Sequence, residues 1–88
     1  MEIIWDELKR ISNIQKHRLD FASLTEEFFA AALVRPARGG RHLAIGEDRN
    51  GVLCVVFAAY GLQGISIVSM RPASKTEREL YREHLKGA

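Results

Sequence analysis

Hydrophobic residues at the start of the chain pass from a strand-like run to a helical period. Ile3-Ile4-Trp5 is a short run of residues that favour β-strands. Asp6 follows it as a good N-cap, with Glu7 in the first turn of the helix that would begin there. The apolar positions that this helix is expected to bury are Leu8, Ile11, Ile14 and Leu19. The pattern predicts a short strand followed at once by an amphipathic helix.

A second helical period follows directly. Its apolar members are Phe21, Leu24, Phe28, Ala31 and Ala32. Ser23 and Glu26 have the spacing of a capping box, in which each side chain accepts the other residue's backbone N–H. Pro36 is the latest point to which the helix can continue, because proline lacks an N–H and clashes with the preceding turn. Residues 35–40 are then expected to form a flexible basic loop.

The middle of the chain changes to a strand-like pattern. A run from His42 to Gly46 precedes Asn50-Gly51, a strong hairpin signal. The unbroken apolar run Val52–Ala59 is typical of a central strand buried on both faces. A second turn at residues 60–64 returns the chain into Ile65–Met70. These segments predict a three-stranded antiparallel meander.

The chain ends in a third helical segment. Ser74 and Glu77 form a second candidate capping box, and Gly87 marks the expected helix end. The order of elements is therefore a short N-terminal strand, two helices, a three-stranded antiparallel meander and a C-terminal helix. This order defines an α+β fold. We expect residues 1–88 to form a single domain, because so short a chain has no material for a second core.

Composition narrows the class of protein. At 47% hydrophobic and 27% charged residues the chain is an ordinary globular mixture, neither disordered nor a membrane span. The single cysteine, Cys54, excludes an intrachain disulfide and a zinc site built from several thiolates. The N-terminus has no basic segment followed by a long apolar stretch, so a cytoplasmic location without a membrane partner is expected. Nothing in the sequence calls for a cofactor.

The net charge of +2 hides a strongly uneven distribution. Residues 35–42 hold three Lys or Arg and no acidic residue, and residues 71–88 hold five against three. Residues 52–70 hold no charged side chain at all. Local concentration of positive charge is what attracts polyanions, so a nucleic acid is the partner class that this distribution favours.

Basic residues of the last helix share one stripe. At 100° per residue, four of them fall within an arc of about 80°. They are Lys75, Arg78, Arg82 and Lys86. An apolar flank of Leu80, Tyr81, His84 and Leu85 lies elsewhere on the helix and could dock on the sheet. The alternative for the stripe is a solvated face with Glu79 and Glu83 in helical salt-bridge register.

Polar residues of the first helix also share one side. The same arithmetic groups Lys9, Asn13, Lys16 and His17, opposite the apolar positions. The alternative is an ordinary solvated face, with a histidine at the helix end that caps the last carbonyls.

Two groups of residues, one near each end of the chain, are specific in combination although each alone is weak. The full set is Trp5-Asp6, Lys9, Asn13, Lys16-His17, Phe21, Ile45-Gly46, Gly51, Val55-Val56, Ile67-Val68-Ser69, Arg71, Ala73, Glu77-Arg78 and Tyr81. In this combination the chain resembles the BrnT family of toxins over nearly its whole length. The resemblance implies a RelE-like fold, the toxin role of a type II toxin-antitoxin system, and ribonuclease activity that inhibits translation. It also implies an mRNA substrate, free or ribosome-bound, and a BrnA-like antitoxin with a ribbon-helix-helix domain.

The residue types fit RNA cleavage without a metal ion. Such a reaction needs a base for the 2′-hydroxyl, cations for the phosphate and an acid for the leaving oxygen. No Asp, Glu and His cluster has metal-ligand spacing, so metal-independent cleavage is expected. The candidate catalytic residues are Lys9, Lys16, His17, Arg71, Arg78 and Tyr81, and the candidate RNA-binding residues are Arg41, Lys75 and Arg82.

Each of the main candidates also has a structural explanation. Arg71 could pair with a neighbouring carboxylate instead of a phosphate, His17 could be structural, and Tyr81 could pack against the sheet. The lack of charge in residues 52–70 supports an alternative function. In that alternative the protein is a weakened or inactive module that binds RNA and antitoxin with the same fold.

Overall fold

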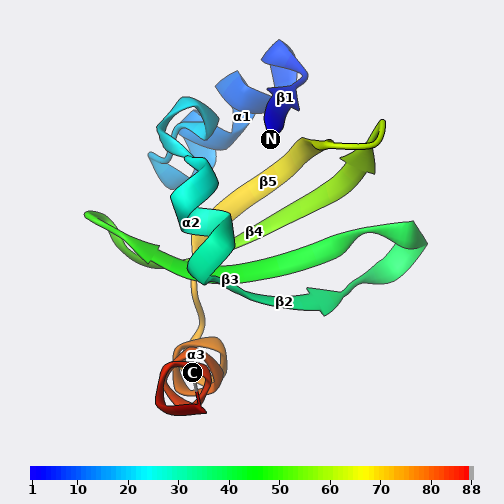
Figure 1. The fold of residues 1–88 in the computed structure, drawn as a ribbon. Helices are drawn as coiled ribbons and strands as arrows, with labels where there is room; N and C mark the ends of the chain where they lie inside the picture. The colour runs from blue at the N-terminus through cyan, green and yellow to red at the C-terminus, as the bar shows by residue number, and fades with distance from the viewer. Residues whose placement is uncertain (88) are drawn as a thin grey trace.

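A five-stranded mixed sheet lies at the centre of the computed structural model, which describes residues 1–87 (Figure 1). The strands, in the spatial order β1-β5-β4-β3-β2, are β1 (Glu2–Trp5), β2 (Leu33–Pro36), β3 (His42–Asp48), β4 (Gly51–Tyr60) and β5 (Gly64–Pro72). The helices are α1 (Glu7–His17), α2 (Glu26–Ala31) and α3 (Lys75–Gly87), with single 3-10 turns η1 (Phe21–Ser23) and η2 (Arg38–Gly40). Helices α1 and α2 lie to one side of the sheet and α3 to the other (Figure 1). The predicted α+β class is confirmed.

The predicted meander is present inside this larger sheet. Strands β3, β4 and β5 pair in antiparallel order, and β4 is the central strand. The sheet also includes β1, the predicted N-terminal strand, which pairs parallel to β5. Strand β2, which pairs antiparallel to β3, was not predicted. Residues 35 and 36, expected in a loop, belong to β2. Pro36 is tolerated there because β2 is an edge strand, where a missing N–H costs little.

The predicted second helix is broken in two. Asp20 caps the 3-10 turn η1 by accepting the N–H of Ala22 (2.9 Å). Thr25 then caps α2, its Oγ1 accepting the N–H of Phe28 (3.1 Å). Ser23 donates its hydroxyl to the Asp20 carbonyl (2.8 Å), so the predicted capping box with Glu26 is wrong. The apolar spacing was right because both pieces face the same core.

The main core lies between the sheet and the α1–α2 side. Its buried members are Leu19, Phe21, Leu24, Phe28, Ala32, Ala44, Leu53, Val55, Ile65, Ile67 and Met70. Gly46 of β3 lies under the ring of Phe28, where an added Cβ would come within 2.8 Å of ring carbons. Leu8 and Ile11 of α1 are 78% and 44% exposed, so the expectation that they are buried was wrong. Helix α1 faces β5 with its polar side instead.

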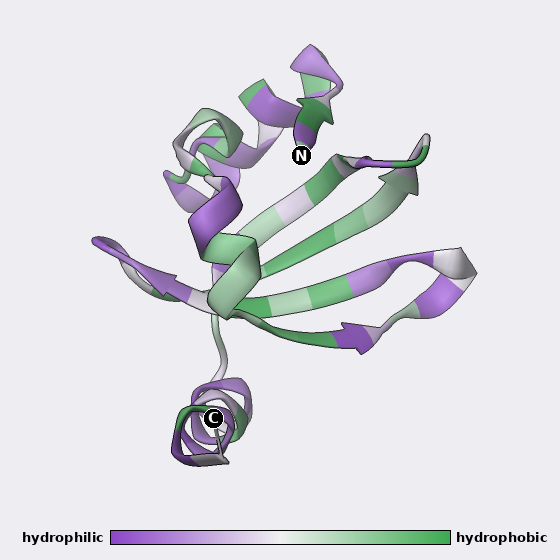
Figure 2. Ribbon diagram, viewed as in Figure 1, coloured by the Kyte–Doolittle hydropathy of each residue, from purple (hydrophilic) through white to green (hydrophobic). Residues whose placement is uncertain are grey.

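Helix α3 begins as the sequence predicts. Ser74 Oγ accepts the N–H of Glu77 (3.2 Å), and the Glu77 carboxylate accepts the N–H of Ser74 (2.8 Å), which confirms the capping box. Tyr81 is buried, and the ring of His84 lies 3.3 Å from the carbonyl oxygen of Ala31. Figure 2 shows that most residues of α3 are hydrophilic. Within residues 1–87, no helix is long and apolar enough to cross a membrane.

Candidate functional site

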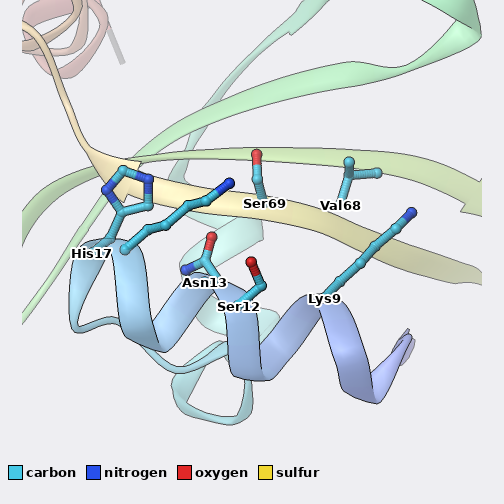
Figure 3. Close-up of a pocket in the computed structure, with 7 residues that line it drawn as sticks. Lys9, Ser12, Asn13, His17, Val68 and Ser69 are labelled. Carbon is cyan, nitrogen blue, oxygen red and sulfur yellow. The ribbon is translucent and has the colours of Figure 1, made fainter.

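A pocket of about 230 Å³ lies between α1 and β5 (Figure 3). Its lining residues are Lys9, Ser12, Asn13, Lys16, His17, Val68 and Ser69. Lys9 and His17 rise from the two ends of α1 toward the strand, with Ser12 and Asn13 between them (Figure 3). The polar side of the first helix, identified from its spacing, is therefore one wall of a pocket rather than a freely solvated face.

Asn13 fixes the helix against the strand. Strand β1 pairs with β5 only as far as Ile67, so the edge of β5 beyond that point has no neighbouring strand. Asn13 Oδ1 accepts the N–H of Met70 there (3.0 Å), while its Nδ2 donates to the carbonyl of Leu19 (3.1 Å). Asn13 is 6% exposed, and both hydrogen bonds are buried. Asn13 therefore positions the pocket wall.

A β-bulge shapes the opposite wall. Phe57 of β4 pairs with Ile67 and Val56 pairs with Ser69, so Val68 is an extra residue in β5. A bulge bends its strand and re-aims the side chains around it. Both Val68 and Ser69 line the pocket as a result. Sequence reasoning did not place Val68 and Ser69 in the site, since no local signal marks a bulge in an apolar strand. It also left out Ser12, although helical spacing puts Ser12 on the same side of α1 as Lys9 and Lys16.

Positive charge dominates the pocket. Lys9, Lys16 and His17 are exposed, and among residues 1–87 none of the three is in a salt bridge. Lys16 and His17 lie in the last turn of α1, where cations are favoured by the helix dipole. Arg18 ends the helix in a left-handed conformation (φ 59°) and donates its N–H to the Ile14 carbonyl. The arrangement offers two exposed ammonium groups and an imidazole to an anion.

Arg71 is held by an acidic partner. Its Nη1 and Nη2 donate to the two carboxylate oxygens of Glu77 at 2.7 and 2.9 Å. The Arg71 guanidinium, aided by the N–H of Ser74 and opposed by partial burial, lowers the pKa of Glu77 to about 2. The carboxylate pairing considered for Arg71 is thus present. Arg71 lies two residues beyond Ser69 on the same strand face, about 7 Å along β5 from the pocket.

The other candidates lie around α3 or at the far edge of the sheet. Arg78 donates to the Ala73 carbonyl at 2.9 Å. Tyr81 is buried, and this burial raises its pKa, in keeping with the packing role considered for it. Lys75 and Arg82 are exposed on α3, and Arg41 precedes β3. The candidates that do not line the pocket are Arg71, Arg78, Tyr81, Arg41, Lys75 and Arg82. Their part in RNA cleavage or binding stays a prediction.

Acidic and thiol groups contribute little to this site. Within the described residues, no three His, Cys, Asp or Glu side chains are placed to hold a metal ion. The Cys54 thiol is buried beneath α3, and burial raises its pKa to about 12. Cys54 therefore stays protonated and serves as a small apolar group.

Comparison with known proteins identifies a family and a similar solved structure. Residues 5–77 match the model of a family described as the ribonuclease toxin, BrnT, of type II toxin-antitoxin systems. The fold matches the 1.1 Å crystal structure of the Brucella abortus ribonuclease toxin, BrnT, with a TM-score of 0.79. The two sequences are 49% identical over 85% of this chain and 99% of the Brucella chain. No curated protein matches the chain.

Proposed function

The chain belongs to the BrnT family of ribonuclease toxins of type II toxin-antitoxin systems, and on that premise we propose that the pocket between α1 and β5 cleaves RNA. Family membership implies an RNA target and an antitoxin partner. The observation that carries the proposal is that two lysines and a histidine share the pocket. Lys9, Lys16 and His17 line it together, and none of them pairs with a carboxylate among the described residues.

The proposed reaction uses the RNA's own 2′-hydroxyl. His17 accepts the 2′-hydroxyl proton, the freed oxygen attacks the adjacent phosphorus, and the bond from phosphorus to the 5′-oxygen breaks. A protonated lysine of the pocket, Lys9 or Lys16, returns a proton to the leaving 5′-oxygen. The products are a 2′,3′-cyclic phosphate and a 5′-hydroxyl. The remaining ammonium group stabilises the negative charge that develops on the phosphoryl oxygens.

Metal independence belongs to the same proposal. A pocket lined by two lysines and a histidine supplies the positive charge that a divalent ion would otherwise bring to the phosphate. Histidine changes charge near neutral pH and can therefore both accept and release a proton. These cations support cleavage in the presence of a chelator.

Biological consequences follow from cleavage of mRNA. We propose that the protein inhibits translation, that a BrnA-like ribbon-helix-helix protein neutralises it, and that its fold is RelE-like. The cationic pocket supports an antitoxin that acts by covering or opposing these charges. Expression of the chain alone should arrest growth, and co-expression of the neighbouring antitoxin gene should relieve the arrest. Normal growth at good expression of folded protein would contradict the toxin assignment.

Purified protein tests the chemistry directly. A labelled RNA should be cut in EDTA, and the same RNA with 2′-O-methyl groups throughout should resist cleavage. Lys16→Ala and His17→Gln should each lower kcat/KM by about 100-fold or more. Lys86→Ala is the matched control, because Lys86 is an exposed lysine outside the pocket and should leave kcat/KM unchanged.

The outcomes separate the two functions considered. Loss of cleavage in EDTA would refute metal independence, and cleavage of the methylated RNA would refute attack by the 2′-hydroxyl. Salt-sensitive binding of RNA with no product, by a protein that still binds its antitoxin, would instead identify an inactive binding module. Circular dichroism of each variant checks that the fold is retained.

A further inference from the structure

One row of paired residues crosses the sheet from the pocket to its far edge. Ser69 of β5 is opposite Val56 of β4, Val56 is opposite Leu43 of β3, and Leu43 is opposite Arg35 of β2. Directly paired residues place their side chains on the same face of a sheet. The pocket residue Ser69 and the exposed Arg35 are therefore the two ends of one row. The row spans three strand spacings of about 4.8 Å, or about 14 Å.

Helix α3 covers the neighbouring row on this face. That row runs from Arg71 through Cys54 and Ile45 to Leu33. Cys54 and Ile45 are each 1% exposed, yet they are not part of the core on the α1–α2 side. Arg71, at one end of this row, pairs with Glu77 in the first turn of α3 at 2.7 Å, which places that turn next to the row.

The row from Ser69 to Arg35 is left partly open. Ser69, Val56 and Leu43 are only half-buried, and none of them carries a charge. Ala58 and Ser66, which pair with each other on the same face, are also half-buried and uncharged. An uncharged strip of sheet therefore connects the cationic pocket to β2.

Cations gather again at the far end of the strip. Arg35 and Arg41 lie on the same face of the sheet. Arg35 is opposite Leu43, and Arg41 precedes Leu43 by two residues in an extended segment. Backbone hydrogen bonds hold this hairpin, from Ala37 N to the Arg41 carbonyl (2.9 Å) and from Arg41 N to the Arg38 carbonyl (3.3 Å). Arg35, Arg38 and Arg41 are all exposed, and within residues 1–87 none of the three forms a salt bridge. Unpaired like charges so close together favour a polyanionic ligand.

We propose that a single-stranded RNA crosses this face, with its scissile phosphate in the pocket and a second phosphate held by Arg35 and Arg41. Phosphates of an unstacked strand lie farther apart than the 3.4 Å or so of a stacked one, so 14 Å corresponds to at most about four nucleotides. The apolar floor selects a single strand, because a duplex keeps its bases stacked inside and cannot lay them on Val56 and Leu43. The proposal rests on the proposed function, for which it defines the substrate as an unpaired segment.

Binding of uncleavable RNA tests the track. Fluorescent 2′-O-methyl oligonucleotides of 3 to 12 residues are titrated against the wild type and the double variant Arg35→Gln/Arg41→Gln. We expect the affinity of the wild type to rise with RNA length until the RNA is long enough to reach the β2–β3 hairpin, and then to level off. For long RNAs the double variant should bind about tenfold more weakly, and the magnitude of its slope of log K against log salt should fall by about 0.7, the value for one phosphate contact on a single strand. For three-residue RNAs the two proteins should bind equally.

Arg49→Gln is the matched control, because Arg49 is an exposed arginine in the β3–β4 turn outside the row. It should leave affinity and salt slope unchanged. In cleavage assays with long unlabelled RNA, the double variant should have a raised KM and an unchanged kcat. This pattern indicates the loss of a contact that binds substrate and transition state equally. Three-residue substrates should be cut equally by both proteins.

The results distinguish failure of the track from failure of the function. If the wild type neither binds nor cuts RNA, the proposed function fails and the track fails with it. If the wild type cuts RNA but the double variant behaves like Arg49→Gln on long substrates, the track alone is refuted. If the double variant binds RNA normally but is no longer neutralised by the antitoxin, this face belongs to a protein partner and the proposal is overturned.

Discussion

The ion pair between Arg71 and Glu77 ties the end of the sheet to α3, and Glu77→Gln is the substitution that removes its charge with the least change in shape. Glu77 accepts two hydrogen bonds from Arg71 and one from the N–H of Ser74. Glutamine keeps one oxygen acceptor but loses the charge and the bidentate pairing. The variant should therefore be less stable than the wild type near neutral pH.

The magnitude follows from the pKa of Glu77. A fall from 4.5 to about 2 on folding corresponds to about 3 kcal/mol, at 1.36 kcal/mol per unit. The Glu77 side chain is 15% exposed but that of Arg71 is 41% exposed, so solvent screens the pair. We therefore expect a loss of about 1–2 kcal/mol in the free energy of unfolding, or about 5–10 °C in Tm for a chain of this size.

The effect should depend on pH in one direction. The folded-state pKa of Glu77 lies below its ordinary value, so its stabilising effect is complete above about pH 5.5 and is lost as pH falls toward 2. Urea unfolding of wild type and variant should give a difference that is constant between pH 7 and about pH 5.5 and then shrinks steadily down to pH 2.5. Glu79→Gln is the control, because Glu79 is exposed on the same helix, and it should change stability by less than about 0.5 kcal/mol. A Glu77→Gln difference that is absent at pH 7, or equal at pH 7 and pH 2.5, would refute this account of the ion pair.

Three further substitutions test other parts of the fold through urea unfolding. Asn13→Ala should lower the free energy of unfolding by about 2–3 kcal/mol, because it leaves a buried N–H of β5 and a buried carbonyl without partners; a loss below 1 kcal/mol would contradict this role. Arg18→Gly should raise stability by about 0.5 kcal/mol, since relief of the left-handed backbone (about 1–2 kcal/mol) exceeds the entropy lost by glycine (about 1 kcal/mol); destabilisation would argue against the φ of 59°. Gly46→Ala should cost about 1–3 kcal/mol as its Cβ meets the ring of Phe28, and an unchanged Tm would show that the ring can move freely.

Local signals predicted the parts of the fold that depend on neighbouring residues in sequence. Asp6 caps α1 by accepting the N–H groups of Leu8 and Lys9, and the Ser74–Glu77 box opens α3. The hairpin around Asn50-Gly51 joins β3 to β4. Each of these is decided within four residues, so the sequence pattern is sufficient to identify it.

Local sequence signals could not predict which strands pair when the strands are far apart in the sequence. Strand β1 pairs with β5 although 58 residues, 6–63, separate the two strands. Strand β2 contributes no residue to the main core, and its residues fall at the end of the predicted helix and in the loop predicted after it. Phe21 and Phe28 are spaced as on one helix because both reach the same core, although a turn of 3-10 helix and an extended link separate them. The hydrophobic period of a segment indicates which of its side chains face the core, but it does not require that the whole segment be one helix.

The same division applies to the site. Lys9, Lys16 and His17 could be grouped from the sequence because one helix carries them all. The strand that faces them could not be identified, because it depends on the bond between Asn13 and Met70, 57 residues apart. Sequence spacing therefore predicted the charged wall of the pocket, on α1, but not the uncharged wall, on β5.

The uncharged segment 52–70 takes on a different meaning once it is placed in the sheet. It forms nearly all of β4 and most of β5, and β4 lies in the centre with both of its faces in use. Charged side chains on Leu53, Cys54 or Val55 would be buried at 0–1% exposure, which folding cannot tolerate without partners. The lack of charge in residues 52–70 follows from burial on the α1–α2 face of the sheet and from the open, uncharged strip on its other face. The lysines of the pocket come instead from α1, and burial of β4 is sufficient to explain its lack of charge without any loss of activity.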